Sequence, residues 1–213
     1  MAAGSISGTE FANQANIFFT LSVKYNDTWD LKSSPHNRNE VYLTKRCNIE
    51  VAENKQVSTN QKQSSSQTAN QSIAEEEDVD VEESDAACLT TTPPPSSSVC
   101  QFEYHIVYSA SYGVPVLYFN AYTQDGRLLS LDSVWNSVPQ HYQDRFQHER
   151  WTTLTQQEHP ILGRPFFQLH PCHTADLMSK LIPESCSGNY LLSWLSAVGP
   201  VVGLKVPLSY VTS

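Results

Sequence analysis

The chain has 213 residues and a formal net charge of −9 at pH 7, which argues against a nucleic-acid-binding protein, because phosphate contacts need clustered Lys and Arg. Residues 53–99 contain two lysines and nine acidic residues, so they carry −7 of that charge. They include no aromatic residue and few aliphatic ones, and such a segment cannot bury enough apolar surface to offset its ordering entropy. We therefore expect a single domain, residues 8–213, interrupted by a disordered acidic, Ser/Thr/Pro-rich insertion at 53–99.

The cysteines are five in number and irregularly spaced, which does not suggest a disulfide framework. No charged-then-apolar leader opens the chain, and its apolar runs are far shorter than the roughly 20 residues of a membrane span. These features predict a reduced, cytoplasmic protein without a membrane span. The cysteines are Cys47, Cys88, Cys100, Cys172 and Cys186.

The first half of the chain shows two clear periodicities. Apolar residues recur at steps of three or four over residues 10–25, which predicts an amphipathic helix. Residues 41–51 alternate between apolar and polar, as a half-buried strand does, and this places Cys47 on the apolar face. After the insertion, residues 102–108 and 116–122 are expected to be antiparallel neighbouring strands, because a short turn containing Gly113 joins them.

The second half alternates short helical and extended patterns. In order, these predict an N-terminal helix, an antiparallel sheet of about four strands and C-terminal helices, which is an α+β fold. The expected elements are a helix at 131–138, a fourth strand at 151–155, an extended run at 165–169, helices at 174–181 and 189–198, and an extended end at 201–210.

Residues 159–173 nominate a reactive thiol, Cys172, at the junction of the run at 165–169 and the helix that begins at 174. Pro165 and Pro171 fix their own backbone torsions and bias the preceding residues toward extended conformations. A stiff, accessible ledge suits a cysteine that must meet another protein's thioester. The histidines around it are possible metal ligands, but no second ligand pair follows, so neither a metal site nor a cofactor is predicted.

Seven strings of sequence carry a resemblance to a known family: 104–109, 114–119, 125–127, 155–163, the Leu-His-Pro-Cys at 169–172, 193–196 and 198–204. With their order, they resemble the ubiquitin-conjugating superfamily, and within it the autophagy enzymes that conjugate a ubiquitin-like protein. The resemblance is good over about 101–210, weak over the first fifty residues and absent in the insertion. It implies the superfamily's α+β core.

The resemblance also implies a relay between proteins. The activating enzyme, autophagy-related protein 7, would deliver autophagy-related protein 12 to Cys172 as a thioester, and the acyl group would then pass to a lysine of autophagy-related protein 5. A thiolate is both a good nucleophile and a good leaving group, so no activating triad is required.

One feature departs from the superfamily pattern, because Cys172 stands where ordinary conjugating enzymes have the asparagine of His-Pro-Asn. Another group would then have to stabilise the oxyanion, and a backbone amide near Cys172 is one candidate. His170 is expected to support the segment before Cys172 by hydrogen bonding rather than to act as a base, and Pro171 is expected to stiffen its backbone. The side-chain candidates for the oxyanion are Tyr104, Tyr108 and Gln156.

Two other functions are compatible with the residues alone. A cysteine hydrolase would use Cys172 with a histidine base and an orienting Asn or Asp, although no hydrolase signature surrounds the thiol. A catalytically silent conjugating-fold module would bind partners without needing the thiol.

Overall fold

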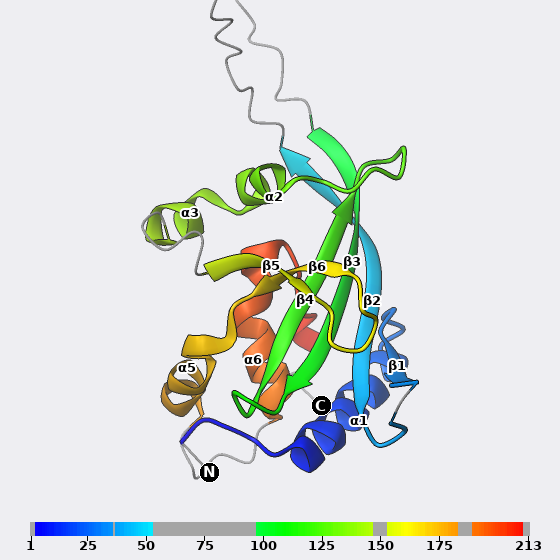
Figure 1. Ribbon diagram of the computed structural model, residues 1–213, viewed down its shortest axis with the longest axis vertical. Coiled ribbons are helices and arrows are strands. Elements are labelled where there is room, and N and C mark those ends of the chain that lie inside the picture. The colour runs from blue at the N-terminus through cyan, green and yellow to red at the C-terminus, as the bar shows by residue number, and fades with distance from the viewer. Residues whose placement is uncertain (1–2, 36, 53–96, 147–152, 183–188, 211–213) are drawn as a thin grey trace, which may run out of the picture.

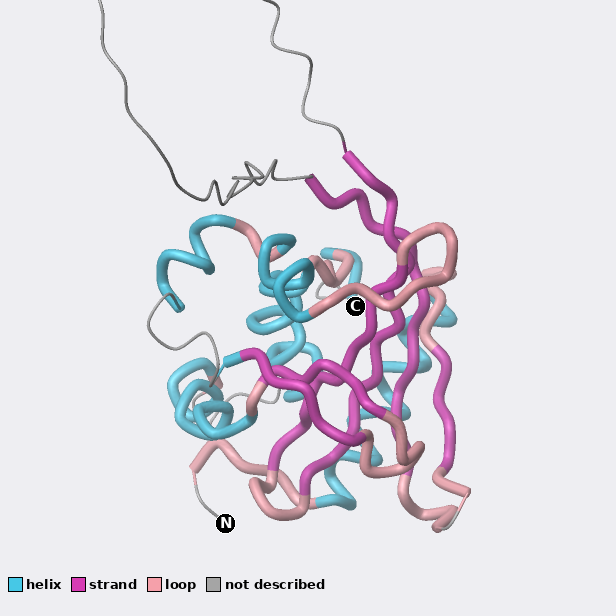
Figure 2. Tube along the Cα trace, turned by 45° about the horizontal axis from the view of Figure 1, so that its top comes forward, coloured by secondary structure: helices cyan, strands magenta, loops and turns pink. Residues whose placement is uncertain are grey.

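The computed structural model describes residues 3–35, 37–52, 97–146, 153–182 and 189–210. Its α+β architecture confirms the predicted fold class, with a curved antiparallel sheet and helices gathered around one face and one end (Figures 1 and 2). The helices are α1 Gly8–Lys24, α2 Leu131–Ser137, α3 Gln140–Phe146, α5 Thr174–Leu181 and α6 Tyr190–Val198, with 3-10 turns η1 Pro171–His173, η2 Gly199–Val202 and η3 Leu208–Tyr210.

The sheet has six strands in the order β1-β2-β3-β4-β6-β5, rather than the expected four or so. Every neighbouring pair is antiparallel. The short β1 was missed because four residues with little burial show no alternation. The strands are β1 Asp30–Ser33, β2 Val41–Ala52, β3 Ser97–Ser109, β4 Val114–Tyr122, β5 Leu154–Glu158 and β6 Pro165–Leu169.

Two strands and one helix differ from the sequence-based expectation. Strand β3 begins at Ser97, which pairs with Ala52, so residues 97–99 belong to the sheet and not to the insertion. The rest of the insertion lies outside the described residues. The fourth predicted strand, 151–155, corresponds to β5, which runs from Leu154 to Glu158. Helix α3 was not predicted at all.

The extended end predicted at 201–210 is wrong, because that stretch contains the 3-10 turns η2 and η3. Gly203 has a φ of 75°, in the left-handed region that favours glycine. The N–H of Leu204 then donates to the carbonyl of Gly199 at 3.0 Å and folds the chain back on itself.

The main core lies between the sheet and helices α1 and α6, which Figure 1 shows behind the strands. Alternation along β3 and β4 sends one set of side chains into this core and the other set to the opposite face of the sheet. Helix α1 contributes the stripe Phe11, Ala15 and Phe18, all buried. Its first turn is capped by Ser7, whose Oγ accepts the N–H of Glu10 at 3.0 Å.

The opposite face of the sheet carries a buried polar network under the turn between β5 and β6. His105 Nδ1 lies 3.0 Å from His159 Nε2, and His105 Nε2 lies 3.3 Å from Glu103 Oε1. The guanidinium groups of Arg46 and Arg164 donate to the same carboxylate at 3.0 and 3.1 Å. The network therefore ties the turn that precedes β6 to strands β2 and β3.

Backbone donors define how the two histidines are protonated. The N–H groups of Ile161 and Leu162 both donate to His159 Nδ1 at 3.2 Å, so that nitrogen carries no proton. The proton of neutral His159 is then on Nε2 and is donated to His105 Nδ1. His105 in turn carries its proton on Nε2 and donates it to Glu103. This assignment leaves both rings neutral, with every ring nitrogen satisfied.

Stability is expected to fall as the pH is lowered. Burial, assisted by the repulsion that a protonated His105 or Arg164 would exert, lowers the pKa of His159 from 6.5 to about 4. Between pH 6.5 and pH 4 His159 is therefore protonated in the unfolded chain but neutral in the folded chain. The free energy of unfolding decreases by about 3 kcal/mol as the pH falls from 6.5 to 4. The hydrogen bond from His105, opposed by burial and assisted by Arg46 and Arg164, lowers the pKa of Glu103 from 4.5 to about 2, which extends the loss below pH 4.5.

Urea unfolding between pH 7 and pH 4 measures this slope. The variant His159→Asn keeps a side-chain acceptor for the turn but does not titrate, so it should lose most of the pH dependence between 6.5 and 4. An unchanged slope in that variant would show that His159 is not its source.

The N-terminal strap, residues 3–7, crosses from helix α5 to the turn between β3 and β4. The N–H of Ile6 donates to the carbonyl of Gly113 at 2.8 Å, and the hydroxyl of Tyr108 donates to the carbonyl of Ile6 at 3.0 Å. Tyr190 of α6 donates its hydroxyl to the carbonyl of Gly4 at 2.6 Å. The strap therefore joins α6, α5 and the β3–β4 turn.

Gly4 is the tightest point of the strap, and Gly4→Ala is expected to cost about 3 kcal/mol. A Cβ at Gly4 would lie 2.0 Å from the carbonyl oxygen of Ala175, and its φ of 79° disfavours any side chain. Gly126→Ala is the matched control, because Gly126 has a φ of 82° but no atom within 4 Å of the place that a Cβ would take, and it should cost only about 1 kcal/mol. Equal losses in urea unfolding would mean that the contact with α5 contributes nothing.

Candidate active site

Cys172 is exposed on the 3-10 turn η1, between the end of β6 and the start of α5. This is the strand-to-helix junction that the sequence predicted. Pro171 suits the first position of the turn, because its φ is fixed and it has no N–H to satisfy, and its side chain is buried. The thiol therefore sits on a short, stiffened turn whose base is anchored in the protein.

His170 acts as the cap of this turn. Its Nδ1 accepts the backbone N–H of Cys172 at 3.2 Å, and its own backbone N–H donates to the carbonyl of Thr153 at 3.0 Å. The ring of Tyr112, from the β3–β4 turn, meets the ring of His170 edge-on, with the centroids 5.8 Å apart. The structure thus places His170 where it holds the backbone of Cys172.

No described residue makes a hydrogen bond to the sulfur of Cys172. The Nδ1 of His170 is occupied by the backbone N–H, so it is not free to take the thiol proton. The same bond removes the amide of Cys172 from the candidates for the oxyanion. A hydrolase would need a base within hydrogen-bond reach of the sulfur, and the described residues supply none.

The three side-chain candidates for the oxyanion are used or placed elsewhere. Tyr104 is fully buried, and its hydroxyl donates to the carbonyl of Val202 at 2.6 Å. Tyr108 donates to the N-terminal strap. Gln156 is exposed on β5 and pairs with Phe167, which precedes Cys172 by five positions.

A groove of about 260 Å³ opens beside the thiol and is called here the Cys172 groove. Figure 1 shows α3 and α5 at the same end of the sheet, on either side of the start of β5, and α6 supplies a further wall. Tyr142 and Phe146, which sequence reasoning missed, line it from α3. Tyr142 and Phe146 are four positions apart and follow Pro139, and this spacing is the sequence signal that could have indicated a helix. The lining residues are Tyr142, Arg145, Phe146, Thr153, Leu169, His170, Cys172, His173, Thr174, Leu177, Ala197, Val198 and Val201.

The other cysteines differ from Cys172 in their surroundings. Cys100 is buried, with 3% of its surface exposed, and Cys47 is half-buried. Burial raises the pKa of the Cys47 thiol, which makes it a poorer nucleophile. Cys88 and Cys186 lie outside the described residues. Among the described cysteines, Cys172 is therefore the one that a large partner can reach.

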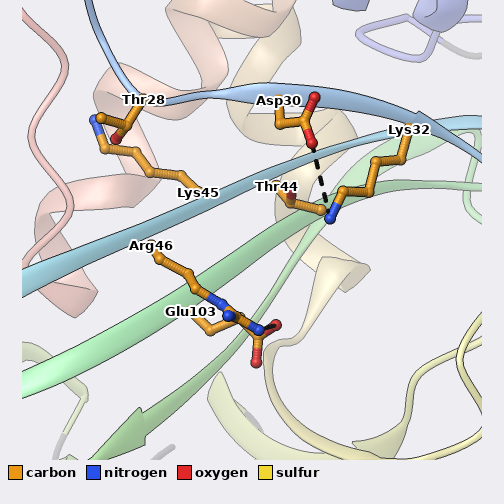
Figure 3. Close-up of a pocket in the computed structure, with 7 residues that line it drawn as sticks. All are labelled: Thr28, Asp30, Lys32, Thr44, Lys45, Arg46 and Glu103. Carbon is orange, nitrogen blue, oxygen red and sulfur yellow. Dashed lines mark hydrogen bonds and ion pairs between the residues drawn. The ribbon is translucent and has the colours of Figure 1, made fainter.

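A second pocket, of about 330 Å³, lies over β1 and β2 and contains neither Cys nor His (Figure 3). Two ion pairs lie within it, Lys32 with Asp30 at 3.8 Å and Arg46 with Glu103 at 3.0 Å. Its remaining charge, on Lys45, is paired with Asp27 outside the lining. Within the described ranges, no group of three or more His, Cys, Asp or Glu residues is arranged to hold a metal ion. No helix there is both long and apolar enough to cross a bilayer.

An antiparallel sheet with helices on one face and an exposed cysteine at a strand-to-helix turn defines a conjugating-enzyme type of domain. The profile of the family described as "Autophagocytosis associated protein, active-site domain" matches residues 10–209, so the chain belongs to this family. The match covers both halves of the sheet and extends back to residue 10, into the part of the chain where the resemblance seen in the sequence was weak.

Curated relatives support the same placement. The chain is 50% identical over 127 residues to the human ubiquitin-like-conjugating enzyme ATG10, covering 58% of each chain. It is 48% identical over 115 residues to the Arabidopsis thaliana enzyme of that name, and 42% over 119 residues to the Dictyostelium discoideum one. These matches span only 51% and 52% of those two relatives' lengths. The resemblance to autophagy conjugating enzymes, and within them to autophagy-related protein 10, is thus confirmed.

Proposed function

We propose that the chain is a conjugating enzyme of autophagy that carries a ubiquitin-like protein as a thioester on Cys172. The observation that carries this proposal is the exposed thiol on a turn capped by His170, with no described hydrogen-bond partner at the sulfur. The proposed partners follow from the resemblance: autophagy-related protein 7 as donor, protein 12 as cargo and a lysine of protein 5 as acceptor. The proposed compartment is the cytoplasm.

Two exchanges at one sulfur make up the proposed reaction. In the first, the thiolate of Cys172 attacks the thioester carbonyl at the C-terminal glycine of protein 12. A new C–S bond forms, the bond to the activating enzyme breaks, and the departing sulfur takes up the proton that Cys172 has lost. In the second, the lysine amine attacks the same carbonyl, a C–N bond forms, and the sulfur of Cys172 leaves and regains a proton.

Positioning supplies most of the proposed rate enhancement, because neither exchange needs water or a cofactor. Holding two reactants in line converts a bimolecular step into an effectively unimolecular one. In this proposal His170 and Pro171 are positioning residues, which fix the backbone immediately before Cys172 and the N–H of Cys172 itself. The domain, residues 8–213, performs the exchange, and residues 53–96 act as a spacer outside it.

A trapping experiment tests the proposal. The chain is incubated with the activating enzyme, ATP and protein 12, and the products are separated with and without reducing agent. A thioester on Cys172 gives an adduct that the reducing agent cleaves, whereas Cys172→Ser should give an oxygen ester that resists it. An adduct that is stable to reducing agent in the unaltered chain would refute the thioester.

A further inference from the structure

We propose that the Cys172 groove is a specificity site for the acyl donor, which takes a bulky apolar side chain from the residue just before the glycine bonded to Cys172. This inference rests on the proposed function and deepens it. It also assigns the groove to the cargo side of the reaction and not to the incoming lysine.

The location of the groove limits what can occupy it. Cys172 is itself part of the lining, so a group that enters the groove lies against the reacting sulfur. Once the glycine is bonded to that sulfur, the α-carbon of the preceding residue lies only about 3.8 Å from the glycine's α-carbon. Because glycine has no side chain, the preceding residue carries the first side chain of the cargo tail beside the groove.

Its size and walls suit an apolar side chain. The volume of about 260 Å³ is below the roughly 300–1,000 Å³ of sites that hold whole small molecules. Apolar side chains from four elements line it: Tyr142 and Phe146 of α3, Leu177 of α5, Val198 of α6 and Val201 of η2. Leu177 is 36% exposed, so its apolar surface would be covered by an occupant.

The charges of the lining argue against a lysine in the groove. Among the residues that the structure describes, thirteen line it and none of these is Asp or Glu, while Arg145 brings a positive charge. A lysine ammonium would lose its hydration there, would gain no carboxylate partner and would meet a like charge. An uncharged aliphatic or aromatic side chain incurs none of these penalties. The acceptor lysine must therefore reach the thioester from outside the groove.

Short peptide thioesters test the inference without any partner protein. Acetyl-Gly-X-Gly thioesters of mercaptoethanesulfonate are mixed with the intact chain, and acylation of Cys172 is followed by intact-protein mass. The sulfur of Cys172 replaces mercaptoethanesulfonate on the glycine carbonyl, and the released thiolate takes up the displaced proton. We expect X = Phe and X = Leu to react about tenfold faster than X = Ala, and X = Lys no faster than X = Ala.

Two pairs of variants locate the effect. Leu177→Asp places a charge in the groove, whereas Leu181→Asp lies one turn further along α5 on an exposed residue outside the lining. Ala197→Phe fills the groove from α6, whereas Ser196→Phe adds the same side chain at the adjacent, exposed position outside the lining. The Phe-to-Ala rate ratio should fall toward one in the first member of each pair and stay near ten in the second.

The outcomes separate this inference from the proposed function. Equal rates for Phe, Leu and Ala, or a fastest rate for Lys, would overturn the groove assignment while leaving Cys172 as a competent acyl carrier. A ratio that falls equally in test and control variants would also overturn it. Failure of every peptide to acylate Cys172 in the folded chain would count against the proposed function itself.

Discussion

Replacing Cys172 by alanine is expected to abolish the reductant-sensitive adduct completely. Alanine has no nucleophilic atom, and the other described cysteines, Cys47 and Cys100, are half-buried and buried. Because the thiol is exposed and makes no hydrogen bond with a described residue, its removal should change the free energy of unfolding by no more than about 0.5 kcal/mol. Adduct formation is measured on gels and stability by urea unfolding.

Cys47→Ala and Cys100→Ala are the matched controls for this experiment. Cys100 is buried in the core, so its truncation should lower stability by about 1–2 kcal/mol while leaving adduct formation at the normal rate in the folded protein. Cys47, half-buried on β2, should behave similarly with a smaller loss. Persistence of the labile adduct in Cys172→Ala would mean that another cysteine, described or not, is the acyl carrier.

Removing the carboxylate of Glu103 is expected to lower stability substantially. The Glu103 side chain is only 7% exposed, and its carboxylate accepts from the N–H groups of His105, Arg46 and Arg164 at 3.0–3.3 Å. Glu103→Ala would leave the buried N–H of His105 without an acceptor and two guanidinium groups without their shared anion. The guanidinium groups of Arg46 and Arg164 are 69% and 46% exposed and can be solvated, so the cost comes mainly from the buried N–H of His105. Leaving a buried donor unsatisfied costs about 1–3 kcal/mol, and with the lost charge-assisted hydrogen bonds we expect a loss of about 3 kcal/mol in urea unfolding at pH 7.

Asp125→Ala is the matched control, because it removes a carboxylate from an ion pair that is exposed. Asp125 and Arg127 are 59% and 80% exposed and 2.8 Å apart, and a pair of this kind contributes less than about 1 kcal/mol. Glu103→Gln, which can still accept from His105, should fall between the two. If Glu103→Ala cost no more than Asp125→Ala, the network would not be what holds the β5–β6 turn on the sheet.

The periodicity of apolar residues predicted the helix and strands in which one face is buried along the whole element. The step of three or four in α1, the alternation in β2 and β3 and the apolar run in β4 follow directly from helical and strand geometry. Helix α1 and strands β2 and β4 were predicted to within two residues at each end, whereas the start of β3 was missed by five. The position of Cys172 at a strand-to-helix junction could also be predicted, because Pro165 and Pro171 restrict the backbone whatever the rest of the fold. Its identity as a conjugating cysteine came from the resemblance.

The features that surround the thiol could not be predicted in this way, because they join residues that are distant along the chain. His105 and His159 are 54 positions apart, and Tyr190 and Gly4 are 186 apart, so no periodicity connects them. Even the oxyanion candidates looked equivalent until the partners of the Tyr104 and Tyr108 hydroxyls were visible.

The sequence by itself thus determined an α+β domain with one thiol on a proline-stiffened turn, since backbone restriction and side-chain periodicity are local properties. Only the tertiary structure decided that His170 caps that turn, that α3, α5 and α6 form an apolar groove without carboxylates beside the sulfur, and that a buried ionic network fixes the strand leading to it. These depend on which elements pack together, and packing is settled by the whole core at once.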